Sequence, residues 1–201
     1  MAANGAAPSP RVAFNDDGIA IVDGKPFFPI GMFIYEMNPE VMAELHELQC
    51  NTVLHGFEPR QLDVIQQHGL MAVCTAEAPW VDFAKDHPAL LAWYLSDEPE
   101  NRGETPEVER RRYLDLKKRD PNHPIGLCHN AFEALARFKD ACDFTMTDIY
   151  PITANRDQNI MGVSLIIDEA RRIHGQAPLD LYSNFRRPGN RQRRLGRAAD
   201  A

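Results

Sequence analysis

Apolar and polar residues alternate along the chain in blocks that predict strands and helices in turn. The segment "KPFFPIGMFIY", residues 25–35, predicts a buried strand. Asn38 and Pro39 follow it, and a capping side chain before a proline is typical of the start of a helix. Apolar residues then recur at spacings of four and three, as one helix face requires, at Val41, Leu45 and Leu48.

Six further apolar segments predict strands at residues 50–57, 70–76, 90–96, 123–130, 143–151 and 177–185. Helical patterns lie between most of them, and the strongest runs from Val163 to Ile173. Regular alternation of strands and helices predicts a parallel sheet covered by helices. A doubly wound sheet would usually show a glycine-rich turn, and the sequence has no G-x-G-x-x-G.

Polar residues with chemical capability gather where these strands end, as they do in (β/α)₈ barrels. We therefore predict an α/β fold of the (β/α)₈ TIM-barrel type. A full barrel takes about 250 residues, so we expect an incomplete one of about seven strands, without strand eight and the last helices. The expected division is a flexible arm at 1–17, the partial barrel at 18–182, and an Arg-rich disordered tail at 183–201.

Composition narrows the function classes. The formal charge is −7, although six arginines gather after residue 185, so the body of the chain is acidic and argues against a nucleic-acid surface. No apolar run approaches the roughly 20 residues of a membrane helix. The start of the chain has no signal-peptide pattern, which gives the cytoplasm as the default and leaves the compartment unknown. The four cysteines form no C-x-x-C pair, so we expect reduced, mostly buried thiols and no metal site.

Three segments together resemble the catalytic domain of clan A glycoside hydrolases. "VDGKPFFPIGMFIY" is similar to the entry into that clan's first strand, and "AWYLSDEPE" to its strand-four ending in Asn-Glu-Pro or Asp-Glu-Pro. "DFTMTDIYPI" resembles its strand six. The resemblance covers residues 18–182 and implies hydrolysis of O-glycosidic bonds with retention, without a cofactor or a metal, on a carbohydrate substrate.

The resemblance makes Glu98 the general acid/base. Glycosidic cleavage needs a carboxylic acid to protonate the leaving oxygen and a second carboxylate across the sugar. Asp97 stands where the clan commonly has an asparagine that contacts the sugar, and an ionised aspartate accepts hydrogen bonds without donating any. Glu98 as a simple turn residue is the alternative.

Further candidate substrate contacts follow from position. Tyr150 shares a strand face with Asp148, with a simple place at the barrel rim as its alternative. Trp80, expected in the loop after the third strand, offers a stacking surface for sugars, and its alternative is a buried indole that anchors the loop. His55, His129 and Asn130 stand at strand ends, with packing or loop roles as their alternatives.

The nucleophile has no candidate. In the clan it is a glutamate closing strand seven, but residues 179–201 contain no glutamate, and their acids are Asp180 and Asp200. We therefore expect a truncated or inactive fragment, whose basic end arises from a frameshift or a mispredicted terminus rather than from anion binding.

A non-catalytic carbohydrate-binding barrel remains open. An aldolase or isomerase barrel would need a Schiff-base lysine or a cluster of metal ligands at the strand ends, and the sequence has neither at those positions. Nothing in the sequence indicates the oligomeric state.

Overall fold

The computed structural model describes residues 10–35, 37–55, 59–151 and 160–174. A six-stranded parallel sheet contains, in spatial order, β4 (Gly31–Phe33), β5 (Thr52–His55), β6 (Met71–Thr75), β7 (Leu90–Asp97), β8 (Ile125–His129) and β9 (Phe144–Thr147). Each strand pairs with the next one along the chain, so the carboxyl ends of neighbouring strands meet at one edge of the sheet.

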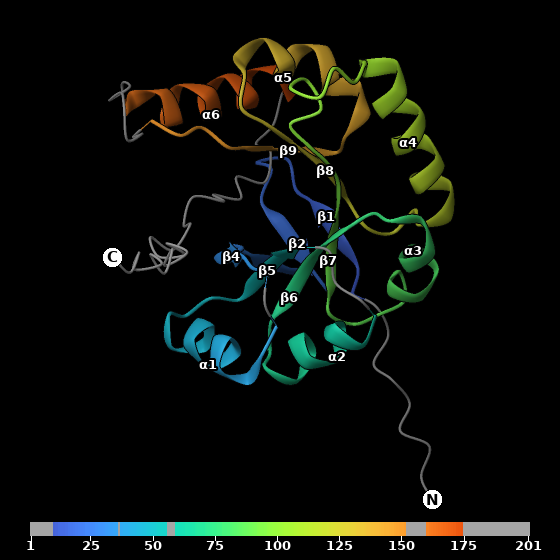
Figure 1. Cartoon of the computed structure of the whole chain (residues 1–201), viewed down its shortest axis with the longest axis vertical. Coiled ribbons are helices and arrows are strands. Elements are labelled where there is room, and N and C mark those ends of the chain that lie inside the picture. The colour runs from blue at the N-terminus through green and yellow to red at the C-terminus, as the bar shows by residue number, and fades with distance from the viewer. Residues whose placement is uncertain (1–9, 36, 56–58, 152–159, 175–201) are drawn as a thin grey trace, which may run out of the picture.

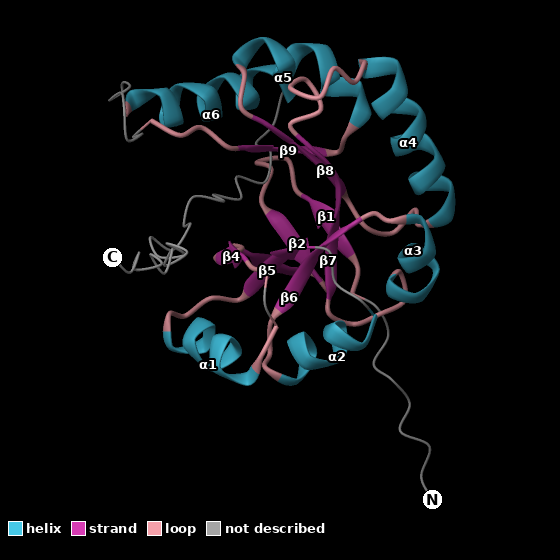
Figure 2. Cartoon of the chain, viewed as in Figure 1, coloured by secondary structure: helices cyan, strands magenta, loops and turns pink. Residues whose placement is uncertain are grey.

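Helices connect these strands and cover one side of the sheet (Figure 1, Figure 2). They are α1 (Pro39–Glu47), α2 (Pro59–Gln67), α3 (Ala78–Ala84), α4 (Pro106–Arg119), α5 (Phe132–Phe138), the 3₁₀ turn η1 (Lys139–Ala141) and α6 (Met161–His174). The predicted start of α1 is confirmed, because Asn38 Oδ1 accepts a hydrogen bond of 2.9 Å from the Val41 N–H. No helix in these ranges is long and apolar enough to cross a membrane.

A second, antiparallel sheet is made of β1 (Val12–Phe14), β2 (Ala20–Val22) and β3 (Lys25–Phe27). It packs on the sheet face opposite the helices, where Phe14 meets the buried Phe144 edge to face at 5.9 Å. Both faces of the parallel sheet are therefore buried: Val53 belongs to the cluster on the helix side and Leu54 to the cluster shared with β1 and β2. β1 lies within the range that the sequence assigned to an arm.

The prediction of an incomplete (β/α)₈ barrel with about seven strands is wrong. The described residues hold six parallel strands, which form a half-barrel, and the separate antiparallel sheet. The expected seventh strand, 177–185, lies outside the described residues. In the described part of the chain β4 and β9 pair on one side only, and six strands leave the sheet open because closure needs a partner for both edges.

The expected single strand at 25–35 is also two strands in different sheets. Asn51 holds the break between them: its Nδ2 donates to the Phe28 carbonyl at 2.9 Å, and its Oδ1 accepts from the Ile30 N–H at 2.8 Å. Pro29 lies between these two groups and has no N–H for a sheet ladder. Only Gly31–Phe33 then joins the parallel sheet.

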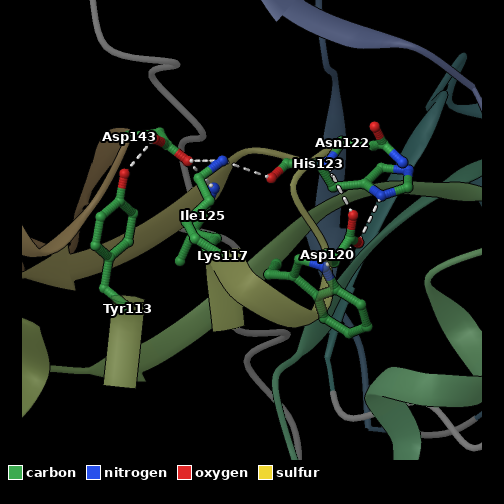
Figure 3. A network of polar contacts seen from close by, with 8 residues as sticks. Tyr113, Lys117, Asp120, Asn122, His123, Ile125 and Asp143 are labelled. Atoms are coloured by element: carbon green, nitrogen blue, oxygen red, sulfur yellow. Dashed lines mark hydrogen bonds and ion pairs between the residues drawn. The ribbon is translucent and has the colours of Figure 1, made fainter. Parts of the chain in front are cut away.

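Two aspartates fix the opposite, amino-terminal end of β8 (Figure 3). Asp120 Oδ2 accepts from the buried Trp93 indole at 2.7 Å and lies 2.7 Å from His123 Nδ1. Burial raises the pKa of Asp120, but these hydrogen bonds outweigh it and hold the pKa below its usual value. Asp143 ties α4 to the strand, because its Oδ2 accepts from the Ile125 N–H and from Lys117 Nζ, both at 2.8 Å.

Candidate functional site

A hollow of about 430 Å³ lies at the carboxyl ends of three neighbouring strands. Its lining comes from β7, β8, β9 and the residues that follow them directly: Asp97, Glu98, Asn130, Asp148 and Tyr150. Four of these five are residues that the sequence singled out, and Asp148 is the strand partner that it gave to Tyr150. The parallel topology brings together groups up to 53 positions apart in the chain.

A bulge in β7 aims Asp97 into this hollow. Tyr94 pairs with Gly126 and Ser96 with Leu127, so Leu95 is an extra residue that the partner strand does not match. The inward and outward alternation shifts by one position there. Ser96 consequently donates to Glu109 of α4 at 2.9 Å on the helix side, and Asp97 turns to the opposite side, above Tyr94.

The backbone at Glu98 is in the left-handed region, with φ of 43°, which is unusual for a residue with a side chain. Its N–H donates to the Cys128 carbonyl at 3.0 Å, which ties the turn to β8. Its Oε2 accepts from Asn101 Nδ2 at 2.9 Å. The partly buried Glu98 carboxylate is therefore held at the rim of the hollow by neutral partners.

Asp97 accepts a hydrogen bond from a buried tyrosine. The Tyr94 hydroxyl donates to Asp97 Oδ1 at 2.5 Å, and Tyr94 is only 7% exposed. Burial raises the pKa of Tyr94 far above its usual value, and the neighbouring Cys128 and the hydrogen bond to Asp97 add to the effect. Tyr94 therefore keeps its proton and stays a donor.

Cys128 lies close to Asp97 and Asp148, with ligand-capable atoms of all three within 4.8 Å of one another. Burial raises the pKa of the Cys128 thiol well above its usual value, and the charges of Asp148 and Asp97 raise it further. Two carboxylates and a thiol are donors that a divalent cation accepts. These are the residues of the site that could hold a metal, which the sequence did not anticipate.

Tyr150 forms the exposed wall of the hollow. Its hydroxyl donates to Asp148 Oδ2 at 2.9 Å, and its side chain is 43% exposed. An aromatic ring fixed in this way at an opening offers a face to an apolar surface. Asn130 lines the hollow beside it from the end of β8.

His129 is turned away from the hollow. It is 1% exposed, its ring packs against Phe138 of α5 at 5.3 Å, and its Nδ1 lies 2.8 Å from Glu100 Oε2. Glu100 Oε1 accepts from the Asn130 N–H at 3.0 Å. Burial raises the pKa of Glu100, but the His129 and backbone hydrogen bonds outweigh it, so the pKa is lowered. Glu100 is a supporting residue that the sequence analysis did not single out.

The two other candidates lie elsewhere. Trp80 is in helix α3 rather than in the expected loop, since Pro79 in the first turn suits a helix start, and it is partly buried outside the lining of the hollow. His55 ends β5, and its side chain lies outside the described part of the structure. The four cysteines are free, three of them buried, as expected.

Comparisons by sequence give no relatives: no family model matches the chain, and no curated protein matches it. The fold, in contrast, matches solved glycoside hydrolases. The β-glucuronidase of Bacteroides uniformis superposes with a TM-score of 0.64 at 13% identity, over 84% of this chain and 26% of that one. The β-D-glucuronidase of Dictyoglomus thermophilum gives 0.64 at 13% identity, over 83% and 38%.

A GH2 β-galacturonidase from Eisenbergiella tayi, bound to galacturonate, gives a TM-score of 0.62 at 16% identity, over 90% of this chain and 40% of that one. At such identities the likeness is one of fold. The chain spans about a quarter to two fifths of the length of these structures. The described part of this protein therefore has the fold of a segment of GH2-type glycoside hydrolases.

Proposed function

We propose that this chain is a glycoside hydrolase-like domain whose hollow at the ends of β7, β8 and β9 holds a sugar. The single observation that carries the proposal is the meeting of Glu98, Asp97 and Tyr150 in that hollow. An acid, an acceptor and an aromatic face at the carboxyl ends of parallel strands suit carbohydrate chemistry. The likeness to solved glycoside hydrolases supports it at the level of fold.

Glu98 is the proposed general acid/base. Its Oε2 is occupied by the Asn101 amide, which leaves its other oxygen for the glycosidic oxygen. In the first step it gives its proton to the leaving alcohol while a second carboxylate forms a bond to the anomeric carbon, and in the second step it takes a proton from the water that displaces this carboxylate. Asp97 and Tyr150 then contact the sugar, Asp97 as an acceptor of hydroxyl protons and Tyr150 through its ring.

Retention needs a second carboxylate about 5 Å from the acid. Among the described residues Asp148 is the carboxylate that enters the hollow from another strand. Its Oδ2 already accepts from Tyr150, and such a hydrogen bond makes a carboxylate a weaker nucleophile. The hydrogen bond from the Tyr94 hydroxyl weakens Asp97 as a nucleophile in the same way.

This last observation favours a second candidate, carbohydrate binding without turnover. Acceptors fixed by tyrosine hydroxyls suit a site that holds a sugar in one orientation. The two candidates share the hollow and differ in one property, catalysis.

The test is a set of 4-nitrophenyl β-glycosides, assayed for nitrophenol release by the full chain and by Glu98→Gln. Hydrolysis predicts turnover that falls by about 10²–10⁴-fold in the variant. Glu47→Gln, at an exposed position in α1, is the matched control and keeps wild-type turnover. Wild-type turnover by Glu98→Gln excludes its role as the acid, and saturable sugar binding without turnover selects the second candidate.

A further inference from the structure

The end of β8 holds residues that line the hollow from three strands. The Cys128 carbonyl accepts from the Glu98 N–H at 3.0 Å, and the His129 carbonyl accepts from the Asp148 N–H at 2.9 Å. Asn130, which follows β8 directly, lines the hollow itself. The positions of all three lining residues therefore depend on the end of this strand.

Glu100 joins the turn after β7 to the same strand end with both oxygens of its carboxylate. Its Oε1 accepts from the Asn130 N–H at 3.0 Å, and its Oε2 lies 2.8 Å from His129 Nδ1. Glu100 stands two positions after Glu98 in the chain. One side chain thus fixes the turn that carries the proposed acid against the strand end.

The Glu100–His129 pair is shielded from water and lies outside the lining of the hollow. The two side chains are 8% and 1% exposed. The His129 ring packs against Phe138 of α5, which supports it from the helix side. A shift of the pair would leave buried polar groups without partners, and that cost keeps the pair in one geometry. The pair can therefore act on a ligand only through the residues that it holds.

The turn between Glu98 and Glu100 transmits such a hold. Pro99 lies between them, is buried, and has its φ fixed by the ring. The left-handed backbone of Glu98 is a conformation that persists only where the surroundings impose it. The Glu104 N–H closes the turn by donating to the Pro99 carbonyl at 3.0 Å. A displacement of Glu100 consequently moves the backbone that aims the Glu98 carboxyl group.

We propose that Glu100 and His129 are a positioning pair, which sets the place of the Glu98 carboxyl group and of Asn130 in the hollow. The inference rests on the proposed function and adds the residues that hold its acid. Glu100 acts through the geometry of its two hydrogen bonds and not through its charge. A misplacement of about 1 Å in an active site costs up to about a hundredfold in rate, so loss of the pair weakens proton transfer first.

Two variants separate geometry from charge. Glu100→Ala removes both hydrogen bonds. Glu100→Gln keeps the length of the side chain: its oxygen can accept from the Asn130 N–H, and its amide can donate to His129 Nδ1, because a neutral imidazole accepts as well as donates. We expect kcat/KM for phenyl β-glycosides to fall about 10–100-fold in Glu100→Ala and to stay within about threefold of the wild type in Glu100→Gln.

Two further variants guard this comparison. Where Glu100→Ala does not fold at the assay temperature, Glu100→Asp takes its place, because it keeps the charge but is too short to make both bonds, and the same loss is expected. Glu133→Ala, at an exposed position in the first turn of α5, is the control and should keep wild-type turnover.

The leaving group distinguishes positioning from a loss of folded protein. A smaller folded fraction lowers kcat/KM by the same factor for every substrate, whereas a displaced acid matters only where the leaving group needs a proton. We expect Glu100→Ala to lose at least about tenfold on phenyl β-glycosides and at most about threefold on 2,4-dinitrophenyl β-glycosides. In the Glu98→Gln background the same change should have no effect on phenyl glycosides, since the acid through which it acts is gone.

Calorimetry gives a second readout that needs no turnover. The probes are the 4-nitrophenyl 1-thio-β-glycosides of glucose, galactose, glucuronic acid and galacturonic acid. Because Asn130 is displaced, Glu100→Ala should bind the tightest of the four about three- to tenfold more weakly than the wild type, and Glu100→Gln should restore the affinity. Urea unfolding of each variant gives its folded fraction, and only a loss of affinity larger than this fraction explains counts as positioning.

The outcomes separate this inference from the proposed function. Wild-type kcat/KM and affinity in Glu100→Ala overturn the positioning pair and leave the result for Glu98 untouched. A loss that is equal for both leaving groups and persists beside Glu98→Gln also overturns it, as does a Glu100→Gln variant that is as impaired as Glu100→Ala. Weaker sugar binding that Glu100→Gln restores, without turnover by the wild type, supports the pair and removes hydrolysis. A wild type that neither hydrolyses nor binds any of these glycosides overturns both.

Discussion

The Tyr94 hydroxyl donates a hydrogen bond of 2.5 Å to Asp97 Oδ1, between two residues of one strand. The bulge at Leu95 makes this contact, because it returns Asp97 to the side of the sheet on which Tyr94 lies. The orientation of Asp97 thus depends on a buried aromatic residue that does not itself line the hollow.

Tyr94→Phe tests this dependence. The ring and its packing against Phe33 are kept, and only the hydroxyl is lost. Asp97 then turns freely, so we expect weaker sugar binding by about three- to tenfold, which corresponds to roughly 1 kcal/mol. The melting temperature should change little because Asp97 is exposed to solvent. An unchanged affinity would show that Asp97 is oriented by something else.

Glu98→Gly and Glu98→Ala test the backbone at the proposed acid. With φ of 43°, any residue with a Cβ is strained at this position, whereas glycine is not. We expect the glycine variant to be about 1 kcal/mol more stable than the alanine variant in urea unfolding. Both lack the carboxyl group, so their difference isolates the backbone. Equal stabilities would mean that the turn relaxes.

The lowered pKa of Glu100 predicts that the free energy of unfolding depends on pH. Its pKa is lower in the folded protein than in the unfolded chain, so its contribution is complete above the unfolded value of about 4.5 and is lost as the pH falls through the folded value. Glu100→Gln should reduce the free energy of unfolding by about 1–3 kcal/mol at pH 7. The gap to the wild type should close below pH 4. A gap that is constant with pH contradicts the assignment.

Alanine substitutions at two glycines form a matched pair that tests how tightly the chain is packed around each of them. A Cβ at Gly126 would come within 2.4 Å of the buried Phe144 ring, whereas one at Gly162 of α6 would lie 3.9 Å from Ile149. Gly126→Ala should therefore cost about 1–3 kcal/mol in unfolding free energy. Gly162→Ala should stabilise the protein by up to about 1 kcal/mol, because alanine favours helix. Similar effects of the two changes would refute this packing.

Much of the fold could be predicted because it is written in local patterns. Strand and helix alternation placed all six parallel strands, and the Val163–Ile173 periodicity found α6, whose buried side chains are Ile166, Ile167 and Ala170. The strand count and barrel closure could not be settled in the same way. They depend on which edges find partners, and that is a property of the whole chain.

The candidate site, like the fold, could be predicted from the sequence only in part. Asp97 and Glu98 could be placed at a strand end from "AWYLSDEPE" alone. The bulge at Leu95 could not, because it exists only in the pairing of β7 with β8. Likewise the Glu100–His129 contact joins residues 29 positions apart, and no local signal distinguishes Glu100 from an acid in an exposed turn.

The central claim is that Glu98 protonates the leaving group. The most direct measurement is kcat/KM of wild type and Glu98→Gln for aryl β-glycosides whose leaving phenols span pKa values from about 4 to about 10. A poor leaving group needs the proton and a good one does not, so the ratio of wild type to variant should rise steeply with leaving-group pKa. A ratio that stays flat across the series would contradict the assignment of Glu98 as the acid.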